Sequence, residues 1–362
     1  MGEIEAGGEV RNGLRFPFIE PPPAGHTLEI APGLLWLRMP LPFGLDHINL
    51  YLLRHGEGWV VVDSGLNTDV GKATWEQVLS TAMANLPIVA LIATHFHHDH
   101  TGLMCWLAER FRCPLYMTAG EFQALHVLPG KGATPGWEFE QFYRQAGLEE
   151  EEVKGLVPVI NDSVFHSELP RSFRRLRGGQ TLQIGTRRWQ VVIGSGHSPE
   201  HACLYCPQDQ LLISGDQVLP RITSSVCVAV TEPLANPLGD WLNSVEQLRS
   251  VPDSVLVLPA HERPFYGLHQ RLDQLRSHHE VHLRALTEQL RGPMSAAQIR
   301  PILFPKIKNR FDLLMALGET LAHLHLLVEQ GVLLRERSHG VYRFCLSHSG
   351  DQPIDLSADI HL

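Results

Sequence analysis

One six-residue stretch, His95-Phe96-His97-His98-Asp99-His100, limits what this chain can fold into more than any other feature. It follows the apolar run 88–93, which predicts a buried strand with covered faces, and it precedes apolar residues at helical spacing over 103–111. Thr101 is a candidate cap for that helix. Because α/β folds carry their chemistry where a strand gives way to a loop and a helix, the sequence predicts an α/β fold with a functional site here.

The residue types in this stretch predict that the site binds metal. His95 and His97 can point the same way in an extended chain, whereas Asp99 and His100 follow a bend and can face a second point. Neutral imidazole and carboxylate ligands suit zinc, with iron and manganese as alternatives. A histidine-rich surface loop would be the simpler interpretation for one or two histidines, but not for four polar side chains packed against a buried strand.

The same local pattern returns along the chain. Apolar runs end in turns that carry one aspartate or histidine, and these residues are Asp63, His197, Asp216 and His261. Glycines flank His197, so its backbone can approach a ligand closely. Asp63 is equally consistent with a turn cap or with a hydrogen bond from the outer ring N–H of a metal-bound histidine. Independent turns have no structural reason to end repeatedly in metal-ligand types, so we expect these loops to converge.

Composition and charge narrow the functional class. The chain has 362 residues, of which 44% are hydrophobic and 19% are charged, and this length allows about two globular domains. The net charge of -9 argues against bulk binding to nucleic acid or to an anionic membrane. No apolar run approaches the ~20 residues of a membrane helix. The N-terminus lacks the apolar core of a secretory signal. Together these features predict a cytoplasmic protein with no membrane association.

Glycine and proline residues mark the expected domain boundaries. We expect an irregular lead-in over 1–25, a large domain over 26–291 with a helical insertion at about 119–177, and a C-terminal domain over 292–362. The C-terminal pattern of two helices followed by a short hairpin predicts a winged helix.

Two groups of residues outside the strand ends also need an interpretation. Aromatic side chains within the insertion are most simply core, with an apolar lid over the site as the alternative, and they are Trp137, Phe139, Phe142 and Tyr143. His278, His279 and His282 fall on a predicted helix, where the simplest interpretation is that all three are exposed.

Taken in order, these residues resemble the five motifs of the metallo-β-lactamase superfamily across about residues 26–265: Asp63, the His95-x-His97-x-Asp99-His100 motif, His197, Asp216 and His261. The resemblance implies an αββα sandwich with two divalent metals, zinc being the favoured ion, in a cleft at one sheet edge. By position, it implies that His95, His97 and His197 hold one metal. It likewise implies that Asp99, His100 and His261 hold the other. Asp216 would bridge the two metals, and Asp63 would support the ligands from behind.

The resemblance also implies a chemistry. An aspartate at the bridging position is similar to the branch of hydroxyacylglutathione hydrolase, lactonases and nucleases, and Asp216 stands there. A hydroxide shared by the two metals would attack the carbonyl of a thioester, ester or lactone. Asp99, or the hydroxide itself, would pass the proton to the leaving group. The expected partner is a small-molecule acyl or ester substrate, and a homodimer is left open.

Two alternatives remain at this point. A metal-dependent endoribonuclease acting on single-stranded RNA is the first, because the C-terminal segment looks like the winged-helix appendage of hydrolases that include a mitochondrial endoribonuclease. The arginines that would contact phosphate are Arg171, Arg174, Arg175 and Arg177. The second is a non-catalytic protein that binds nucleic acid or a partner through Lys306, Lys308 and Arg310. We favour neither.

Overall fold

The computed structural model describes residues 8–42, 44–127, 135–160 and 168–347. The chain divides into two compact units. The first comprises the described residues of Met1–Lys131, Asp162–Ser224 and Ser244–Gln274, and the second those of Gly132–Asn161, Ser225–Asn243 and Leu275–Leu362. Two helices, α7 (Pro237–Gln247) and α8 (Leu268–Gln289), have residues in both units.

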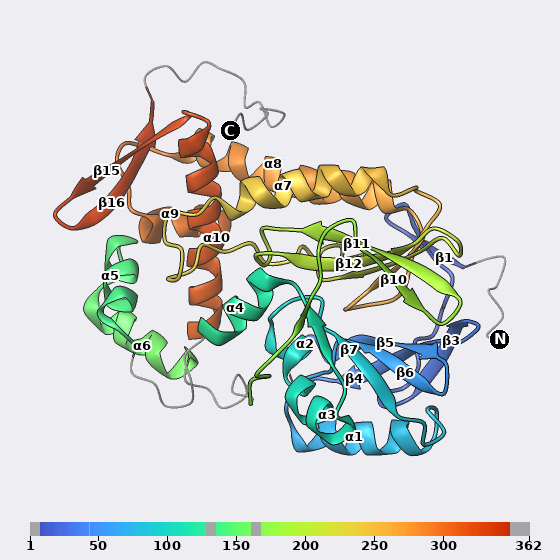
Figure 1. Ribbon diagram of the computed structural model, residues 1–362. Coiled ribbons are helices and arrows are strands. Elements are labelled where there is room, and N and C mark those ends of the chain that lie inside the picture. The colour runs from blue at the N-terminus through green and yellow to red at the C-terminus, as the bar shows by residue number, and fades with distance from the viewer. Residues whose placement is uncertain (1–7, 43, 128–134, 161–167, 348–362) are drawn as a thin grey trace. The chain divides into compact units, whose positions relative to one another are not determined.

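Two β-sheets build the first unit (Figure 1). The seven-stranded sheet has the sequential order β3 (Thr27–Ala31), β4 (Leu34–Pro40), β5 (His47–His55), β6 (Gly58–Val62), β7 (Ile88–Ile92), β8 (Leu115–Met117) and β9 (Arg174–Arg175). The five-stranded sheet has the order β10 (Thr181–Ile184), β11 (Arg187–Gly194), β12 (His201–Cys206), β13 (Leu211–Gly215) and β14 (Leu256–Pro259). One apolar core joins the two sheets, with Trp36 and Val62 from the first and Trp189 and Leu258 from the second.

Helices cover the other face of the seven-stranded sheet. A second core places Trp75 of α1 (Asp69–Ser80) and Leu107 of α3 (Met104–Phe111) against Val61 and Leu91 of the sheet. All residues of β6 are buried, as expected for a strand covered on both faces. The predicted mixed α/β fold of sheets and helices is therefore confirmed.

Strand direction brings the predicted site residues to the same edge. β6 and β7 are parallel, with Val62 paired to Ile92. β13 and β14 are also parallel, with Gly215 paired to Pro259. Parallel neighbours end on the same side of a sheet, so each pair delivers the loops that follow it to one place.

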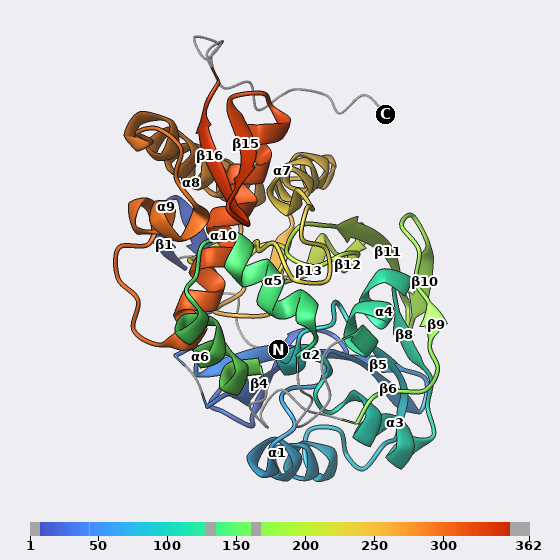
Figure 2. The same cartoon turned by 90° about the vertical axis from the view of Figure 1, so that its left-hand side faces the viewer.

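The second unit combines helices with one hairpin (Figure 2). Its elements are α5 (Trp137–Gln145), α6 (Glu150–Ile160), α9 (Ala296–Leu303), α10 (Arg310–Glu329), β15 (Leu333–Ser338) and β16 (Val341–Leu346). The central helix α10 begins at Asn309, whose side chain accepts a hydrogen bond from the Asp312 backbone, and it contacts α6, α9 and β15. Two helices and a hairpin are present as expected, while the winged-helix identity stays a prediction.

The helix α10 is apolar enough and long enough to cross a membrane, contrary to the expectation that no such run exists. The most apolar window of Arg310–Glu329 has a mean hydropathy of 1.4, and 67% of it is buried inside the protein. Such burial is typical of a core helix in a globular unit, and the packing of α10 against its neighbours accounts for its composition.

The N-terminal lead-in is not irregular, which corrects the sequence-based expectation for its described part. β1 (Glu9–Arg11) and β2 (Leu14–Phe16) form an antiparallel hairpin around Asn12 and Gly13. These two residues have φ angles of 53° and 79°. Positive φ at both central positions defines the tight hairpin turn that Asn-Gly favours. The many Gly and Pro residues of the segment favoured an irregular interpretation, so the hairpin turn at Asn12 and Gly13 was not predicted.

The predicted insertion at about 119–177 does not form a single helical lid. Its first helix, α4 (Ala119–Val127), belongs to the first unit, whereas α5 and α6 belong to the second. Of the four aromatic residues considered for a lid, Phe139, Phe142 and Tyr143 are buried and match the core interpretation. Trp137 is 68% exposed, so the lid role stays a prediction for this side chain alone.

Candidate metal centre

Four side chains from three loops form the first ligand group. His95 and His97 follow β7, His197 follows β11, and Asp216 follows β13. His95 Nε2 lies 2.8 Å from His97 Nδ1 and 3.3 Å from His197 Nε2. His197 Nε2 lies 3.5 Å from Asp216 Oδ2. Two nitrogen ligands of a tetrahedral zinc ion are about 3.3 Å apart, so these atoms already have the spacing of a ligand set.

Three further side chains form a second group beside the first. Asp99 and His100 lie on the short helix α2 (His98–Thr101), and His261 follows β14. Asp99 Oδ2 lies 3.7 Å from His100 Nε2 and 3.4 Å from His261 Nε2. We had expected Thr101 to cap α3, but this expectation was wrong. The Thr101 hydroxyl instead donates to the backbone carbonyls of Phe96 and His97.

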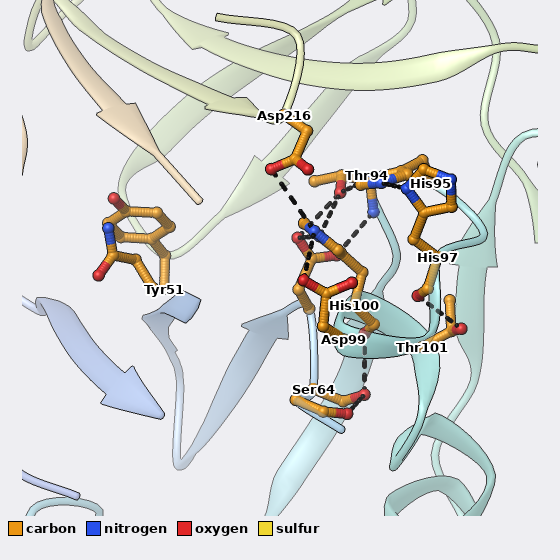
Figure 3. A network of polar contacts seen from close by, with 12 residues as sticks. Tyr51, Ser64, Thr94, His95, His97, Asp99, His100, Thr101 and Asp216 are labelled. Carbon is orange, nitrogen blue, oxygen red and sulfur yellow. Dashed lines mark hydrogen bonds and ion pairs between the residues drawn. The ribbon is translucent and has the colours of Figure 1, made fainter. Parts of the chain in front are cut away.

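The carboxylate of Asp216 faces His100 (Figure 3) and lies close to residues of both groups. Its Oδ2 faces His197, whereas its Oδ1 lies 3.6 Å from His100 Nε2 and 3.5 Å from His261 Nε2. One carboxylate thus presents a different oxygen to each group. The bridging of two metals by Asp216 stays a prediction.

Buried atoms without partners show that this cluster fits divalent cations. His100 Nε2 and Asp216 Oδ1 are inaccessible to solvent and have no hydrogen-bond partner among the described residues. A buried polar atom that makes no hydrogen bond is destabilising unless something else meets it. Three to four imidazole and carboxylate donors around each point are a ligand set that zinc, iron and manganese accept.

Burial and mutual repulsion keep His95 and His97 in the neutral ligand form, whereas, despite burial, the neighbouring carboxylates raise the pKa of His100 and His261. Burial lowers the pKa of His97 to about 3, with repulsion from His197 as the next cause. Burial likewise lowers the pKa of His95 well below its usual value. Burial opposes ionisation of Asp99, but His100 and His261 together lower the pKa of its carboxyl to about 2. Neutral imidazoles and ionised carboxylates are the forms that coordinate metal.

Asp63 contacts Thr94 and the ring of His100, and its role in supporting metal ligands stays a prediction. Its Oδ1 accepts from the Thr94 backbone N–H at 2.8 Å, and its Oδ2 accepts from the Thr94 hydroxyl at 2.9 Å. Asp63 Oδ2 also lies 2.8 Å from His100 Nδ1. This contact directs Nε2 of the same ring toward Asp99 and Asp216, as an outer carboxylate does for a metal-bound histidine.

Backbone contacts orient the last ligand. The Nδ1 of His261 lies 2.9 Å from the His47 carbonyl, which can only accept, so Nδ1 carries the proton and Nε2 is available as a ligand atom. The loop itself is tied to the other sheet, because the Asn49 amide and the Tyr51 hydroxyl both donate to the Pro259 carbonyl.

Glu121 is a positioning residue that the sequence analysis missed. It lies on α4, is fully buried, and uses both carboxylate oxygens. Oε1 accepts from the Ser198 hydroxyl at 2.7 Å and from the Glu200 N–H at 2.6 Å. Oε2 accepts from the Phe96 N–H at 2.9 Å. Glu121 therefore fastens the His95–His97 loop to the loop that carries His197.

We expect Glu121→Gln to lower turnover at least tenfold, with a smaller change in KM. An amide has one acceptor oxygen, so one loop loses its anchor and the ligands shift from their productive geometry. The unsatisfied donors should also lower the free energy of unfolding by about 1–3 kcal/mol. Steady-state kinetics and urea denaturation measure the two effects. Glu109→Gln, on the exposed side of α3, is the matched control, and equal kinetics in both variants would contradict the positioning role.

His201 is a second residue that the sequence analysis missed. Only its position close to His197 in the sequence could have identified it. The ring is buried, stacks on His95 with 4.8 Å between centroids, and accepts the Asp216 backbone N–H at its Nε2. Gly215 permits this approach, because it has a φ of 50° and a Cβ there would lie 2.6 Å from the His201 ring. His201 thus positions the backbone of Asp216.

The basic residues of the alternative functions lie on the surface. Arg171, Arg174, Arg175 and Arg177 are all exposed around β9 in the first unit. Arg174 donates to the Tyr116 hydroxyl, and Arg175 lies 4.0 Å from a Glu200 carboxylate oxygen. Lys306, Lys308 and Arg310 are exposed in the second unit, before and at the start of α10.

Two family models match the chain. Residues 43–261 match the model described as the metallo-beta-lactamase superfamily, and residues 283–347 match the model described as the metallo-beta-lactamase-like C-terminal domain. The first match contains all seven of the clustered histidine and aspartate residues as well as Asp63.

Individual relatives agree with these matches. A solved beta-lactamase domain protein from Burkholderia ambifaria is 41% identical, covers 92% of this chain and 98% of its own, and has a TM-score of 0.85. The probable metallo-hydrolase YqjP of Bacillus subtilis (strain 168) is 25% identical over 303 residues, which are 80% of this chain and 91% of YqjP. The acyl-coenzyme A thioesterase MBLAC2 of Gallus gallus is 24% identical over 265 residues, which are 69% of this chain and 84% of that protein.

Proposed function

Because the chain belongs to the metallo-beta-lactamase superfamily, and is a hydrolase of that superfamily, we propose that it hydrolyses acyl thioesters, with oxygen esters and lactones as poorer substrates. The observation that carries the hydrolytic part is Asp216, whose two carboxylate oxygens face the two ligand groups separately. The thioester part is supported by the similarity to a protein named acyl-coenzyme A thioesterase.

The proposed ligand assignment follows the two groups. His95, His97 and His197 would hold one divalent ion, Asp99, His100 and His261 would hold the other, and Asp216 would contact both. When bound, such ions polarise a carbonyl oxygen and lower the pKa of a water molecule toward neutrality. The metal identity is proposed as zinc on the basis of the imidazole-rich donors.

Asp99 has the position of a proton carrier. Its side chain is 24% exposed, compared with 11% for Asp216 and at most 2% for His100 and His261, so it is the ligand-type carboxylate that substrate reaches most easily. His261 Nε2 lies 3.4 Å from Oδ2 of Asp99. The other oxygen can accept the proton of the attacking water and pass it toward the leaving group.

The leaving group distinguishes the proposed substrates. A thiol of pKa about 8.5 departs as an anion near neutral pH, so thioester cleavage makes little demand on a general acid. Alkoxide and amide leaving groups must be protonated as they depart. A site whose proton carrier is an aspartate therefore favours thioesters.

A matched substrate series tests the proposal. The same acyl group is offered as a coenzyme A thioester, an oxygen ester and a lactone, together with a β-lactam, and product formation is measured with the metal-loaded enzyme. We expect kcat/KM for the thioester to exceed that for the others at least tenfold. Faster cleavage of the β-lactam or the oxygen ester would contradict the thioester assignment while leaving hydrolysis intact.

The exposed arginines around β9 are the specific observation that favours nuclease activity as a second candidate. Each arginine that neutralises a phosphate of single-stranded RNA should add about 0.7 to the slope of log affinity against log salt. Labelled RNA at two ionic strengths therefore belongs in the same series. Rapid cleavage that falls steeply with salt, with no thioester turnover, would replace our proposal by this one.

A further inference from the structure

A second cluster of metal-ligand types lies in the second unit, on α8 and α10. His278 and His282 of α8 and Glu319 of α10 each offer one nitrogen or oxygen atom, and these three atoms lie within 4.8 Å of one another. Residues four apart on a helix share a face, so His278 and His282 present their rings one turn apart. None of the three belongs to the candidate metal centre of the first unit.

The helix histidines correct the expectation that all three are exposed. His279 is fully buried between α8 and α10, where its Nδ1 lies 3.1 Å from His323 Nε2. His323 Nδ1 lies 2.7 Å from the Glu319 carbonyl, which can only accept. The proton of His323 is therefore on Nδ1, and its Nε2 accepts from His279. This chain of hydrogen bonds fixes the two helix segments that carry the cluster.

One buried nitrogen atom of this cluster lacks a hydrogen-bond partner among the described residues, although the three residues of the cluster are half-buried or exposed. His282 Nδ1 is inaccessible to solvent and has no hydrogen-bond partner in the described part of the chain. Glu319 and His282 are both half-buried, one on α10 and the other on α8. A divalent cation would satisfy both kinds of group at once.

We propose that His278, His282 and Glu319 bind one divalent transition-metal ion, with zinc as the reference ion, which links α8 to α10 as a structural site separate from the catalytic cluster. Two imidazoles and one carboxylate suit Zn²⁺, Co²⁺ or Ni²⁺, whereas Mg²⁺ and Ca²⁺ prefer sites built from oxygen. Ligands of zinc lie about 3.3 Å apart, so the side chains need to close by about 1.5 Å at most, and water completes the tetrahedron.

Metal content and thermal stability of the full chain test this site. The double variant His278→Gln/His282→Gln is compared with wild type and with His126→Gln/His339→Gln, which removes two histidines outside both clusters. After equilibrium dialysis against zinc, the first variant should hold one ion per chain fewer than the other two proteins. Its thermal midpoint should also rise less when zinc is added to metal-free protein. Equal zinc content and equal thermal shifts in all three proteins would overturn the site.

A second variant separates loss of metal binding from loss of folding. Glu319→Gln preserves shape and removes the buried charge, so the metal-free protein should be at least as stable as wild type. We expect its zinc-dependent thermal shift to shrink, whereas a purely structural role in packing predicts an unchanged shift. Thioester turnover should stay at the wild-type level in both cluster variants, because their residues lie outside the catalytic machinery. Failure of this site would thus leave the proposed function untouched.

Discussion

Asp216→Asn should lower kcat/KM for the hydrolysed substrate at least about 100-fold, because changes to groups that only support metal ligands already cost 10–100-fold. The amide keeps the size of the side chain but loses its charge, and only one of its two ends can coordinate. Since Oδ1 and Oδ2 face different ligand groups, one metal position loses its shared ligand whichever way the amide points.

Steady-state kinetics and metal analysis of the same preparation measure this loss. Asp209→Asn is the matched control, because Asp209 lies on the surface in the neighbouring hairpin and pairs with Arg187. The control should keep wild-type turnover and metal content. If Asp216→Asn also kept both, the two groups would not share this carboxylate and the two-metal model would be wrong.

Removal of the metal should abolish hydrolysis and lower stability together. Without a cation, His100 Nε2 and Asp216 Oδ1 stay buried without hydrogen-bond partners, and Asp216 repels the charge of Asp99. A ligand present at 100 times its Kd contributes about 2.7 kcal/mol to the free energy of unfolding, so we expect a loss of at least this size on chelation. Activity should return in proportion to added zinc.

Chelation is followed by elemental analysis, so that activity is compared with the metal that remains. Treatment of Asp216→Asn with the same chelator is the control, and its already low activity should change little. Full activity in wild-type protein shown to be free of metal would contradict the account, whereas restoration by iron or manganese but not by zinc would correct only the metal identity.

The grouping of the seven histidine and aspartate residues could be predicted from sequence because each of them follows a strand with a strong apolar pattern. β6, β7, β13 and β14 are short apolar runs, and Asp63, His95, Asp216 and His261 come directly after them or within a few residues. Parallel pairing of neighbouring strands then requires their ends to meet at one edge. Periodicity and residue type were sufficient to identify these positions.

The supporting residues could not be found in the same way. Glu121 lies in the first turn of a helix, where a carboxylate usually complements the helix dipole, and only the folded chain brings it to Phe96 and Ser198. The sequence likewise gave no reason to separate buried His279 from its neighbours on α8, because its partner His323 is 44 residues away. Tertiary contacts of this kind have no local signature.

Two domains were expected, but the membership of α5 and α6 in the second unit was not predicted. The aromatic residues of α5 were compatible with a lid or with a core, and periodicity does not distinguish an apolar face that covers a substrate from one that covers another helix. Phe142 and Tyr143 are buried in a unit that also contains β15 and β16, more than 180 residues further along the chain. Segments so distant in sequence are joined by packing alone.

Anomalous diffraction at the zinc absorption edge, from crystals of the zinc-loaded protein, tests the central claim most directly. We expect one peak within bonding distance of His95, His97 and His197 and a second within bonding distance of Asp99, His100 and His261, with Asp216 contacting both. Zinc bound elsewhere in the first unit, or no zinc among these seven side chains in an enzyme that still hydrolyses its substrate, would contradict the account.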